Sequence, residues 1–398
     1  MKKSYIVIGL GFGDEGKGIT TDYLCLLHPE ALVVRFSGGH QAGHTVALPD
    51  GQRHVFSSFG SGTLRGNSSY WSSYCTLYPS ALLEEYTALQ TLGKTPRLFV
   101  DARSMITTPY DLAYNKAVEM INNHGSCGVG VGPTIERNEL PIPYKFYAQD
   151  MIYPQVAKHR LEVIHTYYQE KAKKDGRVGL LDNYLSLATK NSIDLFFEDM
   201  EDTLKIVDIV AASEIFNRFD TFVFEGSQGI LLDQNYGFFP HVTRTNTTSQ
   251  NAMQLITTYN LGIPEVYYIT RAYLTRHGNG PMANEGHIPE LTHIEKETNV
   301  LNDWQGNFRR SILDLDMINY ALQCDANYTA ICPKHLVVTC LDQLTGPITL
   351  TAHGQVFHPH SFEDVVRKKQ IYAANFQSII QNSADYVNDS IKVIPLDS

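Results

Sequence analysis

An apolar run that leads directly into a glycine-rich loop and then a helix is the feature that most constrains the fold of this chain. Residues 5–9 (YIVIG) are continuously apolar, which predicts a strand buried on both faces. Residues 11–18 (GFGDEGKG) follow at once, and residues 17–27 carry a helical pattern that ends near His28 and Pro29. In a strand–loop–helix unit of this kind, the backbone N–H groups at the helix N-terminus can cradle phosphate. The segment therefore predicts a P-loop-like phosphate site.

Short apolar runs alternate with helical patterns along the rest of the chain. Further buried strands are expected at residues 31–36, 97–100, 221–224, 266–269 and 335–340, with hairpins at 46–56 and about 353–354 and a last strand at 391–395. Helices are expected near residues 80–92, 109–123, 150–173, 199–218, 249–260, 312–323 and 374–386. The alternation predicts an α/β fold with a mostly parallel central sheet flanked by helices. Because no repeat or disordered linker interrupts residues 1–398, we expect a single α/β domain with insertions.

Composition excludes several classes of function. Lys+Arg 32 against Asp+Glu 42 gives a net charge of −10, which argues against a general nucleic-acid or anionic-membrane binder. No apolar stretch approaches the roughly 20 residues of a membrane span, and the N-terminal run is too short for a signal peptide. The six cysteines form no Cys-x-x-Cys pair, which is typical of reduced, cytosolic proteins. We therefore expect a cytoplasmic protein that uses neither nucleic acid nor membrane as a partner.

The first glycine loop departs from an ordinary P-loop at two positions. Gly18 stands where a Ser or Thr hydroxyl would hold Mg²⁺, and the carboxylate of Asp14 lies inside the loop. One interpretation of Asp14 is a metal ligand that has moved into the loop, and another is a general base aimed at a substrate.

A second glycine-rich loop, residues 38–44 (GGHQAGH), follows the next predicted strand and should lie at the same edge of the sheet. Its glycines expose the backbone around His40 and His44, so both cannot be core residues. His44 could act as a general acid opposite Asp14 or bind phosphate. Zinc ligation is a further alternative, although no third and fourth ligand stand nearby in the sequence.

These loops and three later segments together resemble the adenylosuccinate synthetase family. The colinear matches are residues 13–18 (GDEGKG), 39–45 (GHQAGHT), 224–233 (FEGSQGILLD), 240–248 (PHVTRTNTT) and 272–281 (AYLTRHGNGP). The resemblance implies a ligase that forms a C–N bond in two steps. The γ-phosphoryl group of GTP is first transferred, with Mg²⁺, to the 6-oxygen of IMP. The amino group of L-aspartate then displaces phosphate to give adenylosuccinate, as in AMP biosynthesis.

The resemblance also assigns roles to individual residues. Asp14 would take the N1 proton of IMP and bind Mg²⁺, with the carbonyl of Gly43 as a further metal contact. His44 would stabilise the transferring phosphoryl group, Gln228 would hydrogen-bond the 6-position of the purine, and Lys17 would hold nucleotide phosphate. The other expected nucleotide- and substrate-binding residues are Gly13, Glu15, Gly16, Gly18, Gln41, Thr45, Ser126, Cys127, Thr243, Arg276, Arg309, Arg310 and Asp342.

Several departures from the family pattern concern substrate recognition. Residues 302–311 (NDWQGNFRRS) stand where the family has a Thr-Thr-Gly loop followed by arginines, although Arg309 and Arg310 can still clamp carboxylates. Cys340 occupies the place of the family's guanine-pairing lysine, while Asp342 is kept, and the usual Ser-Thr-Gly-Pro segment is not found after residue 396. ATP as phosphoryl donor therefore stays open.

Residues 125–133 (GSCGVGVGP) resemble a family loop but carry Cys127 for threonine and Val129 for arginine, and Gln41 replaces an asparagine. Arg137 is the nearest candidate for the arginine that a partner subunit sends to the nucleotide phosphate, since the family implies a homodimer. The main alternative is a paralogous ligase that joins an amino acid to another 6-oxopurine nucleotide such as dGMP. A non-catalytic nucleotide sensor and a generic P-loop NTPase are further alternatives.

Overall fold

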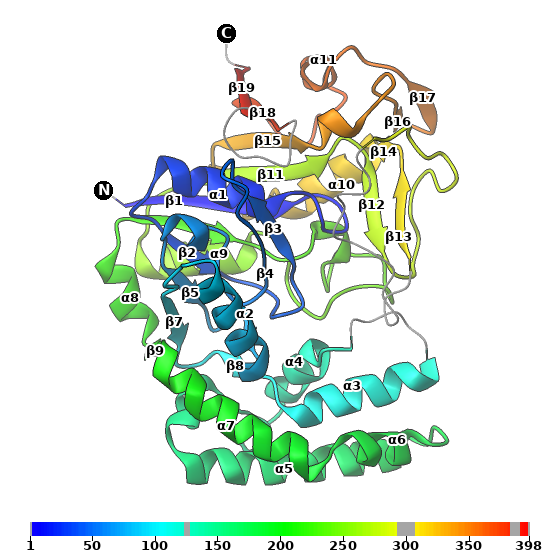
Figure 1. The fold of residues 1–398 in the computed structure, drawn as a ribbon. Coiled ribbons are helices and arrows are strands. Elements are labelled where there is room, and N and C mark those ends of the chain that lie inside the picture. The colour runs from blue at the N-terminus through cyan, green and yellow to red at the C-terminus, as the bar shows by residue number, and fades with distance from the viewer. Residues whose placement is uncertain (1, 123–127, 293–306, 383–390, 397–398) are drawn as a thin grey trace.

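The computed structural model describes residues 2–122, 128–292, 307–382 and 391–396 (Figure 1). Within these residues the central sheet is built from β1 (Lys3–Gly9), β2 (Leu32–Arg35), β5 (Ser69–Trp71), β7 (Leu98–Asp101), β9 (Val207–Val210), β10 (Thr221–Glu225), β11 (Glu265–Arg271), β15 (Lys334–Thr339), β18 (Ser378–Asn382) and β19 (Ile391–Pro395). Their order across the sheet is β19-β18-β15-β11-β1-β10-β2-β5-β7-β9. Neighbouring strands pair in parallel except β18 and β19, which confirms the predicted mostly parallel α/β sheet.

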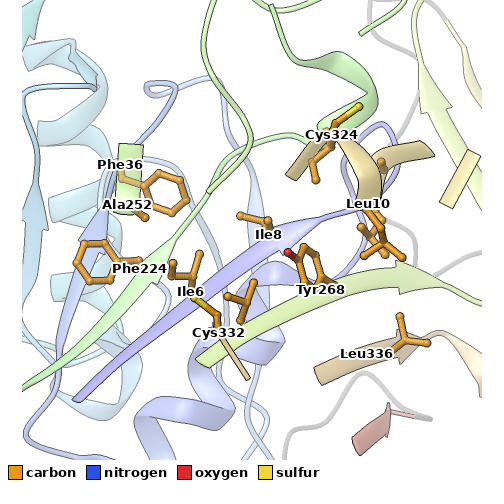
Figure 2. Close-up of a cluster of buried hydrophobic side chains, with 14 of the residues drawn as sticks. Ile6, Ile8, Leu10, Phe36, Phe224, Ala252, Tyr268, Cys324, Cys332 and Leu336 are labelled. Carbon is orange, nitrogen blue, oxygen red and sulfur yellow. The ribbon is translucent and has the colours of Figure 1, made fainter. Parts of the chain in front are cut away.

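The central strands are buried on both faces, which explains their continuous apolar sequences. Along β1, Ile6 and Ile8 face one core and Tyr5 and Val7 face the other, as expected from the alternation of side chains along a strand. Figure 2 shows Ile6 and Ile8 beside Phe224 of β10, with side chains from the covering helices above them. Burial of these side chains favours folding by roughly 25 cal/mol for each Å² of apolar surface removed from water.

Helices cover both faces of the sheet. They are α1 (Lys17–Leu27), α2 (Pro79–Thr91), α3 (Pro109–Asn122), α4 (Val131–Glu139), α5 (Pro154–Asp175), α6 (Leu180–Leu187), α7 (Lys190–Ile206), α8 (Ala212–Arg218), α9 (Gln250–Tyr259), α10 (Leu315–Asp325) and α11 (Phe362–Arg367). Side chains of α8, α9 and α10 pack into the core on one face, and α1 packs on the other. Figure 1 shows α3, α5, α6 and α7 gathered beyond the sheet. Their buried side chains share a core with residues of α2, β5 and β7, such as Leu82, Trp71 and Leu98.

One predicted helix is divided between the end of α7 and α8, and another is wrong. The pattern over residues 199–218 is interrupted by β9, because Val207, Ile209 and Val210 favour a strand, and β9 pairs with β7 at the sheet edge. A helix was expected over residues 374–386, but in their described part, up to residue 382, β18 forms and pairs in parallel with β15. Tertiary pairing of an apolar Ile379-Ile380 pair therefore overrides the local helical pattern.

Short antiparallel units decorate the sheet. Both predicted hairpins are confirmed: β3 (His44–Ala47) pairs with β4 (Arg53–Phe56), and β16 (Leu350–Ala352) pairs with β17 (Gln355–Phe357). A further pair, β12 (Leu274–His277) with β13 (Phe308–Ser311), follows β11 and was not predicted. The remaining strands are β6 (Thr76–Leu77), β8 (Met105–Ile106) and β14 (Leu313–Asp314). None of the described helices has the length and apolar character needed to cross a membrane.

Candidate active site

A cavity of about 680 Å³ lies at the edge of the sheet where the carboxyl ends of its parallel strands meet. Loops that follow β1, β2, β10, β11 and β15 line it, because the strands run in one direction and end together. Most of the expected site residues are brought together here. Those that line the cavity are Gly13, Asp14, Glu15, Gly16, Lys17, Gly18, Gln41, Gly43, His44, Thr45, Gln228, Thr243, Arg276 and Asp342.

The first glycine loop adopts a backbone that its sequence is suited to. Gly13 and Gly16 have φ values of 96° and 98°, and Asp14 lies between them at 57°. Positive φ is uncommon outside glycine, and aspartate is among the residues that tolerate it. Three neighbours hold the loop: Nε of Arg271 donates to the Asp14 carbonyl, Oγ1 of Thr275 to the Gly13 carbonyl at 3.4 Å, and Oγ1 of Thr339 to the Glu15 carbonyl at 2.8 Å.

The charged side chains of Glu15 and Lys17 both bind backbone groups, Glu15 within its own loop and Lys17 in the loop after β10. The Glu15 carboxylate accepts a hydrogen bond from the Gly11 N–H, and burial raises the pKa of Glu15 to about 8. The Lys17 ammonium donates to the carbonyl of Gln228, and burial lowers the pKa of Lys17. Lys17 therefore lies at the cavity wall with its ammonium tethered to the neighbouring loop after β10.

His44 forms a buried pair with a carboxylate that sequence reasoning did not single out. Its Nδ1 lies 2.7 Å from Oε1 of Glu225, the last residue of β10. The Ser61 N–H donates to Oε2 of Glu225 at 3.1 Å, and the Ser61 hydroxyl donates to Oε1. Burial lowers the pKa of His44, and the Glu225 charge opposes that shift. Nε2 of His44 is therefore left to face the cavity, and the contact of Nδ1 with Glu225 fixes the orientation of the ring.

Two glutamines present unsatisfied carbonyl groups at the cavity. Gln228 has a φ of 46°, and its Oε1 is buried without a hydrogen-bond partner among the described residues. The same holds for Oε1 of Gln41. Buried acceptors without partners are costly, so such groups at a cavity wall point to a ligand that supplies donors.

His277, which lies beside Asp14, is a second residue that was not predicted as part of the site. Nε2 of His277, at the end of β12, lies 3.6 Å from Oδ2 of Asp14. His277 belongs to segment 272–281, which resembles the family, but the residue itself was not predicted to be part of the site. Other cavity residues that sequence reasoning missed are Arg53, His241, Arg244 and Arg271.

Basic residues on the wall near Thr243 are held by the protein itself. The Arg276 guanidinium packs 4.2 Å over the ring of Phe12 and donates to the carbonyls of Pro281 at 2.6 Å and His241 at 3.1 Å. Burial, aided by the charge of Arg309, lowers the pKa of Arg276 to about 10. This wall is therefore preorganised and electropositive, as suits an anionic ligand.

The cavity extends to the loop after β15. Cys340, with a φ of 59°, and Asp342 line this end together with Gln343 and Asn382. Burial leaves Gln343 almost inaccessible, and its side-chain carbonyl accepts a hydrogen bond from the Tyr273 hydroxyl. The end of the cavity is thus lined by a carboxylate, a thiol and amides.

Some expected site residues lie elsewhere. Arg309 and Arg310 do not line the cavity; Arg309 donates to the carbonyls of Gly278 and Gly280 and pairs with Glu285. Ser126 and Cys127 lie outside the described residues, as does the first half of the 302–311 segment, residues 302–306.

The suggestion that Arg137 reaches a partner subunit is wrong. Its side chain is 0% exposed, and its Nε lies 3.0 Å from Oδ1 of Asp111. A second guanidinium nitrogen donates to Oδ2 of Asp111 at 3.0 Å, and a third to the Tyr144 carbonyl at 2.7 Å. Arg137 is therefore a structural residue that ties α4 to α3.

The site offers oxygen donors for a hard divalent cation. The Asp14 carboxylate and the Gly43 carbonyl belong to the two loops that line the same cavity. No group of three or more His, Cys, Asp or Glu side chains that could hold a metal ion occurs in the described part of the chain. This donor set fits Mg²⁺, which is commonly bound by one or two carboxylates together with substrate phosphates.

Comparison with known proteins gives consistent results. The family model of adenylosuccinate synthetase matches residues 6–392. The adenylosuccinate synthetase of Clostridium botulinum (strain Alaska E43 / Type E3) is 28% identical over 417 residues, covering 97% of this chain and 93% of that protein. That of Rhodococcus jostii (strain RHA1) is 28% identical over 410 residues, covering 96% and 92%.

Two solved structures share the fold. The fully ligated adenylosuccinate synthetase of Plasmodium falciparum superposes with a TM-score of 0.71 at 18% identity, covering 100% of both chains. The succinoaminodeoxyadenylate synthetase of cyanophage S-2L, bound to dGMP and to dATP as an energy donor, has a TM-score of 0.60 at 17% identity, covering 100% of this chain and 96% of that one.

Proposed function

The chain belongs to the adenylosuccinate synthetase family, whose members are ligases that form a C–N bond, and from this premise we propose that it joins L-aspartate to IMP at the expense of GTP. The products are adenylosuccinate, GDP and phosphate. The observation that supports this best is the meeting of Asp14, Lys17, His44 and Gln228 around one cavity. These groups suit proton removal, phosphate binding, phosphoryl stabilisation and recognition of a polar ring edge.

In the first step, the Asp14 carboxylate takes the proton from N1 of the purine. The electron pair released into the ring increases the nucleophilicity of O6, which attacks the γ-phosphorus of GTP. The bond between that phosphorus and the bridging oxygen breaks, and GDP leaves with the pair. Phosphoryl transfer of this kind depends on positioning and charge stabilisation. Lys17 and the loop N–H groups would supply both on the phosphate side.

His44 would contact the phosphoryl group through Nε2. Its Nδ1 is bound to Glu225, so the ring cannot rotate away, and the carboxylate stabilises positive charge on the imidazole. Gln228 would donate through its amide N–H to the 6-oxygen of the purine, which is an acceptor only. Of the remaining residues, Gly13, Glu15, Gly16, Gly18, Gln41 and Thr45 would contribute to nucleotide binding at the two glycine loops.

When bound by Asp14 and the Gly43 carbonyl, Mg²⁺ would neutralise charge on the phosphate oxygens. In the second step, the aspartate amine attacks C6, the C6–O6 bond breaks, and phosphate leaves with its electron pair while the amine loses a proton. Thr243 and Arg276, on the electropositive wall, would bind the nucleotide's own phosphate. Arg309 and Arg310 would serve the carboxylates of aspartate only after a rearrangement, because their side chains do not line the cavity.

The residues at the Cys340 end of the cavity favour a second candidate function. Asp342 could accept from the N1–H and N2–H₂ of a guanine, but Cys340 supplies no cation beside it. ATP as phosphoryl donor and another 6-oxopurine nucleotide such as dGMP as acceptor are therefore the alternative, and the cyanophage synthetase with this fold is described with dGMP and dATP. From the family we further propose a cytoplasmic homodimer.

A product screen by mass spectrometry tests this proposal. The enzyme and Mg²⁺ would be combined with IMP, GMP or dGMP, with aspartate or another amino acid, and with GTP or ATP. Adenylosuccinate from IMP and aspartate is the expected product. A succinyl adduct formed only from dGMP would replace the first candidate by the second, and triphosphate hydrolysis without any adduct would exclude both.

A further inference from the structure

The contact between His277 and Asp14 places an imidazole directly behind the carboxylate that the proposed reaction uses as its base. His277 ends β12, and its ring packs 4.7 Å from the ring of Phe308 on β13. Nε2 lies 3.6 Å from Oδ2 of Asp14, and both side chains are mostly buried, at 18% and 23% exposure. Small movements of either side chain would close this distance to a hydrogen bond.

The surroundings of the ring decide which nitrogen carries the proton. Nδ1 of His277 is buried and has no hydrogen-bond partner among the described residues. A proton on Nδ1 would leave a buried donor unpaired, whereas a proton on Nε2 faces the Asp14 carboxylate. The geometry therefore favours the Nε2–H form of the neutral ring, with Nε2 donating to Asp14.

Within the part of the chain that the structure describes, no hydrogen bond other than a tightened contact with His277 would fix the Asp14 side chain. Its backbone is held in the left-handed region, at a φ of 57°, by the hydrogen bond from Arg271 to its carbonyl. That bond orients the backbone and leaves the carboxylate free to rotate. A donor on Oδ2 would fix the carboxylate and leave Oδ1 directed to the ligand.

We propose that His277 is a positioning residue that orients the Asp14 carboxylate through Nε2, so that Oδ1 meets the N1–H group of a 6-oxopurine nucleotide. This inference rests on the proposed role of Asp14 as the base. It predicts that an apolar residue at position 277 lowers the turnover number and that a residue which retains a donor at the place of Nε2 preserves it.

The pair can be tested without catalysis by NMR of protein labelled with ¹⁵N-histidine. Spectra recorded at about pH 9, where an ordinary imidazole is neutral, report which nitrogen carries the proton. His277→Gln identifies the signal by its loss. We expect the Nε2–H form in the wild type and a changed Nε2 shift in Asp14→Asn. The exposed pair His353 and Asp316, 3.5 Å apart, is the matched control, and Asp316→Asn should leave the His277 signal unchanged.

Kinetics test the role. His277→Leu should lower kcat about 10- to 100-fold, as is typical when a group that orients a catalytic ligand is removed, with KM for the nucleotide changed less than about 2-fold. His277→Gln, whose amide N–H can occupy the place of Nε2–H, should stay within about 5-fold of wild type.

The outcomes separate this inference from the proposed function. An active wild type with unchanged kcat in His277→Leu, or a His277 signal indifferent to Asp14→Asn, would overturn the positioning role alone. A wild type that ligates no nucleotide, while the NMR signal responds to Asp14→Asn, would overturn the ligase proposal and with it any catalytic use of the pair.

Discussion

Nδ1 of His44 and Oε1 of Glu225 lie 2.7 Å apart, which joins the second glycine loop to the end of a central strand. Both groups are almost inaccessible to solvent, and Ser61 donates twice to the same carboxylate. The imidazole thus enters the cavity in one orientation. We expect catalysis to depend on Glu225 as strongly as on many residues that touch substrate.

Glu225→Gln should lower kcat of ligation about 100-fold, because the amide keeps the shape but removes the charge that orients the His44 ring and favours positive charge on it. KM for the nucleotide should change little. Steady-state kinetics and circular dichroism would be measured together. Ser61→Ala, which removes one donor to Glu225, is the milder control. A Glu225→Gln enzyme with wild-type kcat would contradict the proposed role of the pair.

Asp14→Ala and Asp14→Asn should both abolish ligation while leaving a folded protein. A carboxylate in a glycine loop contributes little packing, and asparagine tolerates the φ of 57° found at this position. Product formation would be followed by mass spectrometry, and the melting temperature of each variant would be compared with that of wild type. Ligation at the wild-type rate in either variant would remove Asp14 from the mechanism.

Arg137→Leu should destabilise the protein by about 3–5 kcal/mol, because it leaves the buried carboxylate of Asp111 without its cation. The free energy of unfolding would be measured with urea. The double variant Arg137→Leu, Asp111→Asn should recover part of the loss, since no unpaired charge remains and the amide oxygen can still accept from Thr108 or Tyr168. If Arg137→Leu instead kept full stability and lost nucleotide affinity, Arg137 would be a binding residue after all.

Asp22 should make stability depend on pH. Burial raises its pKa from 3.8 to about 6, although Arg65 at 2.6 Å opposes the shift. The folded state therefore holds the proton of Asp22 more tightly than the unfolded chain does. The protonated carboxyl group stabilises the folded state fully below about pH 4, and this stabilisation is lost as the pH rises through about 6. Relative to Asp22→Asn, which resembles the protonated form, the wild type should lose about 3 kcal/mol over that interval.

Urea unfolding of both proteins between pH 4 and pH 7 would check this dependence. The free energy of unfolding of the wild type, relative to that of Asp22→Asn, should fall as the pH rises. Parallel curves would show that Asp22 has the same proton affinity in the folded and unfolded chain.

The site could be predicted best where its residues are neighbours in the sequence. The loop from Gly11 to Gly18 could be predicted because its strand, glycines and lysine are contiguous, and the structure places Asp14 and Lys17 at the cavity. Glu225 was missed as a site residue because its partner His44 is 181 residues away in the sequence. His277 was missed because it reaches Asp14 from a separate strand pair, β12 with β13.

The wrong elements have a related cause. β9 and β18 are edge or near-edge strands of four and five residues, whose formation depends on pairing with β7 and β15 rather than on local preference. Arg137 was misassigned because a sequence pattern cannot show that Asp111 buries it. The division of the chain into one domain stays a prediction, as do the individual roles of the site residues.

The central claim is that the 6-oxygen of a purine nucleotide leaves as phosphate. It is tested most directly with IMP labelled with oxygen-18 at the 6-position, incubated with aspartate, Mg²⁺ and GTP. The phosphate released would be examined by mass spectrometry. We predict one labelled oxygen in the phosphate for each adenylosuccinate formed. Adenylosuccinate accompanied by unlabelled phosphate, or release of phosphate with the label still on the purine, would contradict the account.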